Sequence, residues 1–422
     1  MKIKDIEVIW LDVPMHEIAG RAMERSQNGW SISEIIRVTT ESGLVGIGEN
    51  LPGYYGATKA ESIARARGQN PFDLLWDDTL GAGLQMALFD VAGKAAEAPV
   101  YRLLGNKIRD WCPISWWAMD MPPEDFAEET KRAAALGYTT FKQKARPWWD
   151  VYEQARLTSA VASEGFSIGY DFNGLLIHEA NAIPVLAELD HYSIIGLYES
   201  PIPHGDFEGY HRIRSKTNRP IAVHYGNFGF MSRSAITPVD WKKYYDGFVL
   251  DQIGAAGILR HGHWAEEANM PFWMQTCGTG ISTAMGLHLG SVLKHAQWPL
   301  VSCVNIYQNQ LITQPIVVQG GYARVPEAPG LGIEFNEETL KWQVHSPEKP
   351  NVDALYAVVR HDGNRTWYAD EMGPAGYWND FANGSQPICE HGVRLERWDN
   401  DGSPEWRDMA QRVQTAPVRT RE

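Results

Sequence analysis

The chain has 422 residues, of which 44% are hydrophobic, so it is long enough for two or three domains and can bury a large core. Its 52 acidic and 38 basic residues give a formal net charge of −14. This balance argues against nucleic acid as a partner, because nucleic-acid binding needs a basic surface, whereas an anionic small molecule can still bind in a locally basic pocket.

The first 110 residues indicate a sheet followed by helices. A polar stretch without periodicity, His16–Ser31, is predicted to be a loop, and Ala82–Lys94 has apolar residues at helical spacing. Three strands are predicted, at Lys2–Val13, Ile35–Val38 and Val45–Gly48. This order predicts an α+β domain over residues 1–110.

Short apolar runs alternate with helix-forming stretches from Trp111 onward, with a period of roughly 25–30 residues that indicates βα units. Good helix formers fill connections such as Pro123–Leu136 and Trp149–Ser163. The strands are predicted at Cys112–Trp117, Thr140–Lys144, Ser167–Asp171, Ile195–Glu199, Ile221–His224, Gly247–Leu250, Phe272–Gln275 and Val301–Ile306. Eight such units in about 215 residues predict an α/β fold, a (β/α)8 TIM barrel over residues 111–328. A doubly wound sheet shares the alternation and is the alternative.

The alternation stops after about Pro329. The remaining residues are polar, with strand-like pieces at Ala354–Arg360 and Arg365–Ala369 that are separated by a turn signal at Asp362-Gly363. We expect residues 329–422 to return to the N-terminal domain and to end in a polar extension, which packs on that domain or on a neighbouring subunit.

Two lysines end the second predicted barrel strand, where functional groups of such a barrel gather. Lys142 and Lys144 are two residues apart and therefore point to the same face. Neighbouring ammonium groups lower each other's pKa, which makes a lysine usable as a base near neutral pH. The alternative is a solvated strand end with two surface lysines.

Two carboxylates end the next two strands. Asp171 and Glu199 are one strand–helix unit apart and are expected to be neighbours in the barrel. Adjacent carboxylates repel each other unless a cation lies between them, and a divalent metal ion is the usual cation. The alternative is that each carboxylate caps the helix that follows it.

This set of strand ends resembles the enolase superfamily, in its mandelate racemase and muconate lactonizing branch. The Lys-x-Lys end, Asp-x-Asn one strand later and Glu-x-Pro one strand after that are similar to motifs of this branch. Over roughly residues 1–340, further stretches resemble the family's capping sheet, capping helix, link to the barrel and return segment: Val45–Glu49, Leu88–Lys94, Pro99–Gly105 and Pro329–Glu334. The resemblance implies that the N-terminal α+β domain caps the barrel.

The resemblance also implies the chemistry, which is removal of the proton α to a carboxylate with a metal ion stabilising the enediolate. It implies Lys144 as the base, Lys142 as its electrostatic partner, and Asp171 and Glu199 as the first two metal ligands. Mg²⁺ is the ion that the family implies.

The third metal ligand departs from the family pattern, which has an acid at the end of the fifth strand. His224 and Tyr225 stand there in this sequence, and Asn227 is a second candidate ligand. Ligation by a ring nitrogen of His224 would make Mn²⁺, Fe²⁺ or Zn²⁺ plausible ions. The alternative is that the third ligand is lost.

The seventh strand departs from the family pattern as well. Many relatives have a His there that pairs with an Asp of the sixth strand. Asp251 is present, but the seventh strand continues into Gln275-Thr276-Cys277 without a His, so this dyad is predicted to be absent. One-base chemistry from Lys144 remains, or chemistry with another acid such as Tyr225 or Cys277.

Substrate contacts are expected from the capping domain closing over the barrel. Arg21 and Arg25, in the predicted loop, are candidates to bind a substrate carboxylate in a bidentate fork, although they also fit two exposed surface arginines. Asn173 and Trp149 are further candidate substrate contacts, and core packing is the alternative for Trp149.

We therefore expect a metal-assisted lyase, an acid-sugar dehydratase that acts on a small hydroxylated carboxylate. A racemase, epimerase or cycloisomerase of the same chemistry is one alternative, and a non-catalytic binding or regulatory relative with a degraded metal site is another. By analogy with the family, we expect a homo-oligomer.

The compartment follows from the cysteines and the N-terminus. The four cysteines, Cys112, Cys277, Cys303 and Cys389, form no metal-binding spacing, which predicts free thiols in a reducing compartment. The first 14 residues lack a signal-peptide core, and no apolar run reaches the roughly 18 residues of a membrane helix. The sequence predicts a soluble, cytoplasmic protein with no membrane partner.

Overall fold

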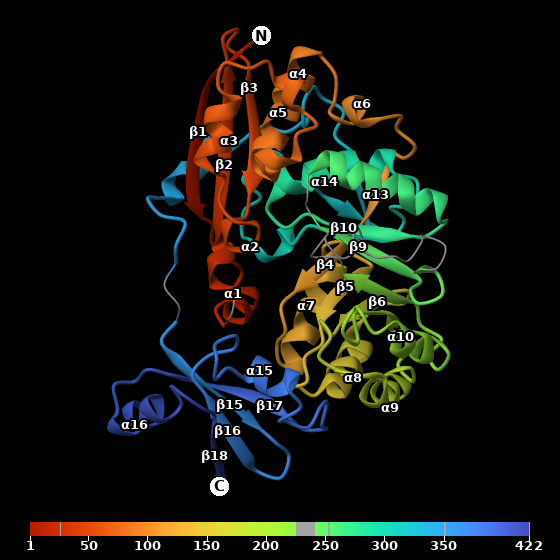
Figure 1. The fold of residues 1–422 in the computed structure, drawn as a ribbon, viewed down its shortest axis with the longest axis vertical. Helices are drawn as coiled ribbons and strands as arrows, with labels where there is room; N and C mark the ends of the chain where they lie inside the picture. The colour runs from red at the N-terminus through yellow and green to blue at the C-terminus, as the bar shows by residue number, and fades with distance from the viewer. Residues whose placement is uncertain (26, 225–240, 252–253, 350–351, 422) are drawn as a thin grey trace.

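The computed structural model describes residues 1–421 except 26, 225–240, 252–253 and 350–351. These residues form an N-terminal sheet with helices, a central barrel and a C-terminal sheet (Figure 1). No helix in this part of the chain combines the length and the apolar character that crossing a bilayer requires.

The N-terminal sheet is an antiparallel meander whose strands are β1 (Ile3–Asp12), β2 (Ile32–Thr40) and β3 (Val45–Asn50), with the late strand β14 (Gln343–Val344) added beside β1. Helix α5 (Ala82–Ala95) packs across β2 and β3. Its close approach explains the two glycines of β3, because a Cβ atom at Gly46 or Gly48 would collide with the backbone of α5. Short helices complete this region: α1 (Glu17–Met23), α2 (Pro52–Tyr55), α3 (Ala60–Ala66), α4 (Pro71–Leu74) and α6 (Tyr101–Leu104).

The buried carboxylate of Asp90 joins this sheet to the segment that returns from the barrel. It accepts hydrogen bonds from the backbone N–H groups of Ile47 and Leu331, each at 2.8 Å, and from Lys94 Nζ at 2.7 Å. Burial raises the pKa of Asp90 above its usual value, although Lys94 and the two N–H groups oppose the shift. Two stretches that are far apart in sequence therefore meet at one carboxylate.

The barrel is confirmed, because the parallel strands pair in chain order and the last one closes on the first, with Val301 opposite Ser115. Its strands are β4 (Trp111–Ala118), β5 (Thr140–Lys144), β6 (Ser167–Asp171), β7 (Ile195–Glu199), β8 (Ile221–His224), β9 (Gly247–Asp251), β10 (Phe272–Gln275) and β11 (Leu300–Val301). A short hairpin of β12 (Val318–Gln319) and β13 (Tyr322–Arg324) adds to β4.

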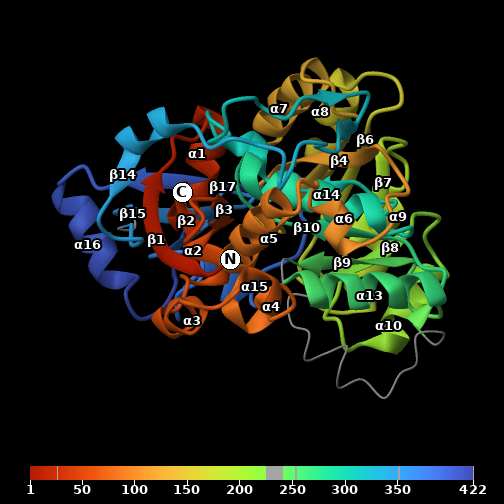
Figure 2. The same ribbon diagram turned by 90° about the horizontal axis from the view of Figure 1, so that it is seen from above.

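Helices cover the outside of the barrel (Figure 2): α7 (Pro123–Ala135), α8 (Val151–Val161), α9 (Glu179–Leu189), α10 (Phe207–Arg214), α13 (Ala255–Glu267) and α14 (Gly280–Val292). Alternation along each strand separates the two faces. In β5, for example, Phe141 packs outward on Phe126 of α7, with ring centroids 5.7 Å apart. Lys142 and Lys144, which alternate with Phe141 and Gln143 along the strand, therefore face the barrel interior.

Two local predictions were wrong. The segment predicted as a loop, His16–Ser31, contains α1 and a short 3₁₀ helix, because Ala19, Ala22 and Met23 are buried against the core and tertiary packing stabilises a helix that is too short to form alone. The eighth strand ends at Val301 instead of Ile306, because Cys303 adopts a left-handed backbone with φ of 60° and a 3₁₀ turn follows.

The C-terminal residues form an antiparallel sheet in the order β17-β15-β16-β18, with two helices. These elements are β15 (Ala354–Val359), β16 (Asn364–Tyr368), α15 (Tyr377–Ala382), β17 (Arg394–Asp399), α16 (Pro404–Arg412) and β18 (Val418–Arg421). The sheet lies beside α1 and α8 (Figure 1), and Trp148 and Trp149 of the barrel pack among its aromatic side chains. The C-terminal sheet thus packs on the barrel, a contact that the sequence did not indicate.

Candidate active site

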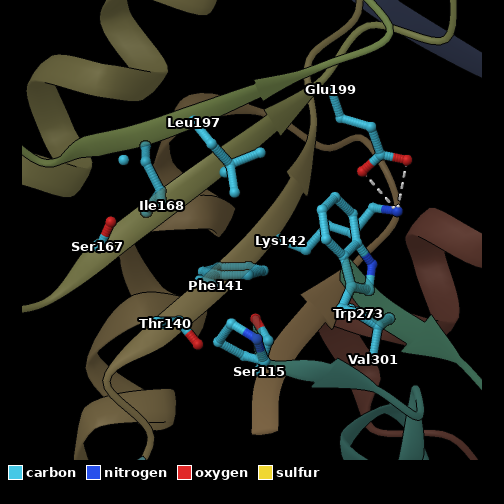
Figure 3. Close-up of a pocket in the computed structure, with 13 residues that line it drawn as sticks. Ser115, Thr140, Phe141, Lys142, Ser167, Ile168, Leu197, Glu199, Trp273 and Val301 are labelled. Atoms are coloured by element: carbon cyan, nitrogen blue, oxygen red, sulfur yellow. Dashed lines mark hydrogen bonds and ion pairs between the residues drawn. The ribbon is translucent and has the colours of Figure 1, made fainter. Parts of the chain in front are cut away.

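The two lysines of β5 are both buried at the mouth of the barrel. Lys142 Nζ lies 2.9 Å from Glu199 Oε1 and 2.9 Å from Gln275 Oε1, and Figure 3 shows its contact with Glu199. Lys144 Nζ lies 2.5 Å from Asp171 Oδ2 and 3.0 Å from the side-chain oxygen of Asn173. The barrel therefore brings each lysine to one of the two predicted carboxylates.

The surroundings shift the pKa values of the two lysines in opposite directions. Burial opposes the charged form of Lys142, but Glu199 and Asp171 outweigh it and raise its pKa above the usual value. Burial lowers the pKa of Lys144, and the positive charges of Lys142 and Arg146 add to this effect against the attraction of Asp171. Lys144 is accordingly the better proton acceptor of the pair, and Lys142 remains a fixed positive charge.

Asp171, Glu199 and His224 end three consecutive strands and converge. One ligand atom from each, a carboxylate oxygen or a ring nitrogen, lies within 4.8 Å of the others, and all three residues are buried. Asp171 stands directly opposite Glu199 in the β6–β7 ladder. Two carboxylates and one imidazole form a donor set that suits a divalent metal ion.

The ring of His224 is held on its other side by Asp251. Nε2 of His224 lies 2.9 Å from Asp251 Oδ1, and Nδ1 lies 3.3 Å from Glu199 Oε1. Burial lowers the pKa of His224, but the two carboxylates outweigh burial and raise it to about 9. A carboxylate that holds one ring nitrogen of a histidine commonly supports metal binding through the other nitrogen. With Asp251 on Nε2, the side chains present therefore fit a divalent metal ion that is bound through Nδ1.

Two of the candidate residues, Tyr225 and Asn227, lie outside the described residues, and their roles stay predictions. Asp251 was expected to lack a histidine partner on the seventh strand, and that strand ends in Gln275 instead. The structure pairs Asp251 with His224 of β8, whose proximity to Asp251 could not be read from the spacing of the sequence.

The two arginines of the N-terminal segment make other contacts. Arg21 is half exposed and pairs with Glu17 and Asp125. Arg25 is nearly buried and pairs with Asp120, its nitrogen 2.9 Å from Oδ2. Among the described residues, no hydrogen bond or ion pair joins either arginine to the lysine–carboxylate cluster, and their role in substrate binding stays a prediction.

The indole N–H group of Trp149 also donates to Asp120, at 2.9 Å, as does that of Trp148. The side chain of Trp149 is buried between the barrel and the C-terminal sheet. Asp120 thus connects the segment after α1 with the segment after β5, and the tryptophans of the second segment pack on the C-terminal sheet.

Arg146 is a site residue that the sequence analysis missed. Its guanidinium donates to the backbone oxygen of Asp171 at 3.0 Å and to Asn173 Oδ1 at 2.7 Å, and it lies over the ring of Trp378 at 5.0 Å. The signal was present, because Arg146 follows Lys144 at the same two-residue spacing that relates the two lysines. Asn173, a predicted substrate contact, is shared between Arg146 and Lys144.

The N-terminal domain reaches the site through helix α2. Gln275 Nε2 donates to the hydroxyl of Tyr54 at 3.1 Å, and the hydroxyl of Tyr55 donates to the backbone oxygen of Gln275 at 3.3 Å. The ring of Trp30 packs between Tyr54 and Trp117, at centroid distances of 4.8 and 5.4 Å. Aromatic side chains, rather than the predicted arginines, therefore cover this side of the mouth.

A cavity of about 170 Å³ lies inside the barrel, on the N-terminal side of Lys142 and Glu199 (Figure 3). Its walls include Ser115, Thr140, Ile168, Leu197, Trp273 and Val301. Lys142 Nζ lies 5.3 Å from the ring centre of Trp273, an arrangement that favours the charged amine. The cavity is mostly apolar and leaves the charged groups clustered at the mouth.

Comparison with known proteins agrees with this architecture. The sequence model of the Enolase C-terminal domain-like family matches residues 125–339. The N-succinyl-L-Arg/Lys racemase of Bacillus cereus is 25% identical over 337 residues, which cover 73% of this chain and 89% of the racemase. The D-gluconate dehydratase of Thermoproteus tenax is 26% identical over 379 residues, which cover 78% of this chain and 73% of that enzyme.

Solved structures agree in fold. The crystal structure of the same Bacillus cereus racemase superposes with a TM-score of 0.66 at 22% identity, covering 82% of this chain and 99% of the racemase. That of muconate cycloisomerase from Pseudomonas fluorescens superposes with a TM-score of 0.64 at 21% identity, covering 82% of this chain and 99% of the cycloisomerase.

Proposed function

This chain belongs to the enolase superfamily, in its mandelate racemase and muconate lactonizing branch, and we propose that it is an acid-sugar dehydratase that removes the proton α to a carboxylate. The observation that carries the proposal is the buried cluster at the mouth, in which Lys142 and Lys144 face Asp171, Glu199 and His224. Such a cluster combines a base with a cationic site for a carboxylate substrate.

Lys144 is the proposed base. Its Nζ lies at the barrel mouth with a lowered pKa, so a larger fraction of it is neutral near pH 7 than for an exposed lysine. Asp171 and Asn173 hold the amine from one side, which orients it before it takes the α-proton. Lys142 stays protonated and supplies positive charge where negative charge develops on the substrate.

We propose that Asp171, Glu199 and His224 hold a divalent ion, which when bound supplies Lewis-acid stabilisation of the negative charge on the substrate carboxylate. Two of the three donors are carboxylates, which suit Mg²⁺. The imidazole suits Mn²⁺, Fe²⁺ or Zn²⁺ as well, so we propose Mg²⁺ as the family's ion and these three ions as alternatives.

Dehydration is favoured over racemisation by the end of β10. Gln275 stands at the end of the seventh barrel strand and hydrogen-bonds Lys142, so the His–Asp dyad of a two-base racemase of the mandelate kind is not present at these strand ends. Similarity to a dehydratase that acts on a sugar acid supports the same substrate class.

The experiment incubates the full chain with Mg²⁺ or Mn²⁺ in D₂O with a panel of aldonates, aldarates and N-succinyl amino acids. We expect an aldonate or aldarate to lose water and give a 2-oxo-3-deoxy acid, detected by NMR and mass spectrometry. Substitution Lys144→Ala should lower the rate by about 10²–10⁴-fold. Lys131→Ala is the matched control, because Lys131 is an exposed lysine of α7 that pairs only with Glu128 in the described contacts.

Two outcomes would contradict the proposal. Deuterium incorporation at the α-carbon with inversion and without loss of water would identify a racemase or epimerase. A chain that binds metal stoichiometrically and yet neither dehydrates nor exchanges any acid in the panel would identify a binding relative.

A further inference from the structure

Two thiols contact each other beside the lysine cluster. Cys277 follows β10 and Cys303 follows β11, their Sγ atoms lie 3.2 Å apart, and each residue is only 1% exposed. A disulfide bond is about 2.05 Å long, so a movement of roughly 1 Å would join these two sulfurs. The other two cysteines, Cys112 and Cys389, are buried, and the thiol of Cys112 donates to the backbone oxygen of Leu287.

The backbone holds the two cysteines in register. The parallel ladder continues past the strand ends, with the N–H of Thr276 bonded to Val301 O at 2.9 Å and the N–H of Gly278 bonded to Ser302 O at 3.0 Å. Cys303 adopts a left-handed backbone with φ of 60°, which is unfavourable for a residue with a Cβ atom and persists only where the surroundings impose it. The fold therefore holds the backbones of the two cysteines side by side.

The chemical environment distinguishes the two sulfurs. Burial raises the pKa of Cys303, and so does its hydrogen bond to Cys277, while the positive charges of Lys142 and Lys144 act in the opposite direction. Cys303 accordingly keeps its proton. The two lysines favour negative charge at the sulfur pair.

We propose that Cys277 and Cys303 are a modification site at which a small hydroperoxide forms a reversible disulfide. The sulfur of Cys277 attacks one peroxide oxygen, the O–O bond breaks, and a sulfenic acid and one water molecule form. The sulfur of Cys303 then attacks the sulfenic sulfur, the S–O bond breaks, and the leaving hydroxide takes the Cys303 proton to give a second water. Two thiols are oxidised by two electrons and one hydrogen peroxide is reduced.

The burial of Cys277 and Cys303 limits the size of an oxidant that can reach them. A low-molecular-weight disulfide such as oxidised glutathione must bring its own sulfur in line with the attacking sulfur, and the 1% exposure of each cysteine leaves no room for it. Hydrogen peroxide is small and uncharged, so it is the oxidant class that fits.

The disulfide would form next to groups that act in the proposed reaction. The N–H of Cys277 donates to the hydroxyl of Tyr55 at 3.3 Å, and that hydroxyl donates to the backbone oxygen of Gln275, whose side chain holds Lys142. Oxidation would fix the end of β10 beneath α2. Any effect on catalysis rests on the proposed function, whereas formation of the disulfide does not.

The test treats the reduced full chain with a few molar equivalents of hydrogen peroxide at neutral pH, alkylates the remaining thiols and maps the peptides without reductant. We expect a Cys277–Cys303 crosslinked peptide, the loss of two of four thiols and full recovery with dithiothreitol. Oxidised glutathione in a parallel sample should leave all four thiols free. Circular dichroism confirms that the protein stays folded during treatment.

Two variants test the roles of the individual cysteines. In Cys303→Ser, the sulfenic acid on Cys277 has no partner and should be captured when the oxidised protein is denatured in the presence of a sulfenic-acid trap, whereas Cys112→Ser should form the crosslink like the unmodified chain. The proposal is overturned if folded protein keeps four thiols in peroxide, if the two cysteines become separate sulfinic acids, or if glutathione forms mixed disulfides. The map of the unmodified chain decides the question even where a variant does not fold, and no substrate is needed.

Discussion

His224 and Asp251 form a buried pair across the ends of β8 and β9, with Nε2 of the imidazole 2.9 Å from a carboxylate oxygen. Because a carboxylate cannot donate a proton, Nε2 carries the hydrogen of this bond. The ring is thereby oriented with Nδ1 toward Glu199, 3.3 Å away. Asp251 acts through His224, and His224 is the side chain that faces the proposed metal ion.

Metal affinity should depend on pH through His224. The pKa of His224 is raised to about 9 without a metal ion, so at pH 7 a proton must leave Nδ1 before that nitrogen can bind a cation. Affinity should therefore rise by about tenfold per pH unit between pH 7 and 9 and level off above. Calorimetric titration with Mn²⁺ in buffers of different ionisation enthalpy should show release of about one proton.

The control for this dependence is His224→Asn, which keeps a polar donor but has no titrating group. Its affinity for Mn²⁺ should be weaker and should lose the rise between pH 7 and 9. An unmodified chain whose affinity does not change over that range would show that His224 is not a ligand.

Arg146 should position Lys144 for proton abstraction. It holds Asn173, which contacts Lys144 Nζ, and its positive charge helps to lower the pKa of Lys144. In Arg146→Met the pKa of Lys144 should rise, so the acidic limb of the kcat profile should move to higher pH, because a base works only when it is neutral. Arg146→Lys should restore part of this shift.

Trp378 provides the matched test of the C-terminal sheet, because its ring lies under Arg146. Trp378→Leu should shift the same limb in the same direction. Trp406→Leu, in the separate cluster between β15 and α16, should lower the melting temperature without moving the profile. Equal profiles in both variants would limit the C-terminal sheet to a stabilising role.

Asp120 should contribute more to stability than most surface acids. It is fully buried and accepts from Arg25 and from two indole N–H groups. Asp120→Asn leaves the nearly buried Arg25 without its counter-charge, so the free energy of unfolding should fall by about 3–5 kcal/mol. Urea denaturation at pH 7 measures this change.

Asp125→Asn is the control, because Asp125 pairs with the half-exposed Arg21 and its loss should change stability by less than about 1 kcal/mol. The pKa of Asp120 is lowered because Arg25 and Arg146 outweigh burial. Its contribution should therefore be complete above its unfolded pKa of about 4 and should disappear as the pH falls. Equal losses in the two variants would contradict the assigned role of Asp120.

The local sequence pattern was sufficient to predict most strands of the barrel. The predicted bounds of β5, β6, β7, β8 and β10 agree with the structure, because apolar runs flanked by turn residues mark buried strands regardless of their neighbours. The same pattern placed Lys142, Lys144, Asp171 and Glu199 at strand ends, and a closed parallel barrel brings such ends to one rim.

Partners across the rim could not be read from the sequence. Asp251 was expected to have no histidine partner on the seventh strand, and its pairing with His224 of β8 was not foreseen. Arg25 was considered as a substrate contact, and the structure pairs it with Asp120. Such pairings depend on how far each side chain extends and on which charges are buried together. Neither factor produces a repeating pattern that can be recognised in the sequence.

The barrel, the N-terminal sheet and the strand ends that carry the charged groups could be predicted from the chain alone, because alternation and turn residues act over a few neighbouring positions. Contacts between distant segments set the pairing of the buried charges, the helical form of α1, the contact of Trp378 in α15 with Arg146, and the meeting of two distant thiols. These features arise from packing between segments far apart in the chain, where burial and distance set the energies.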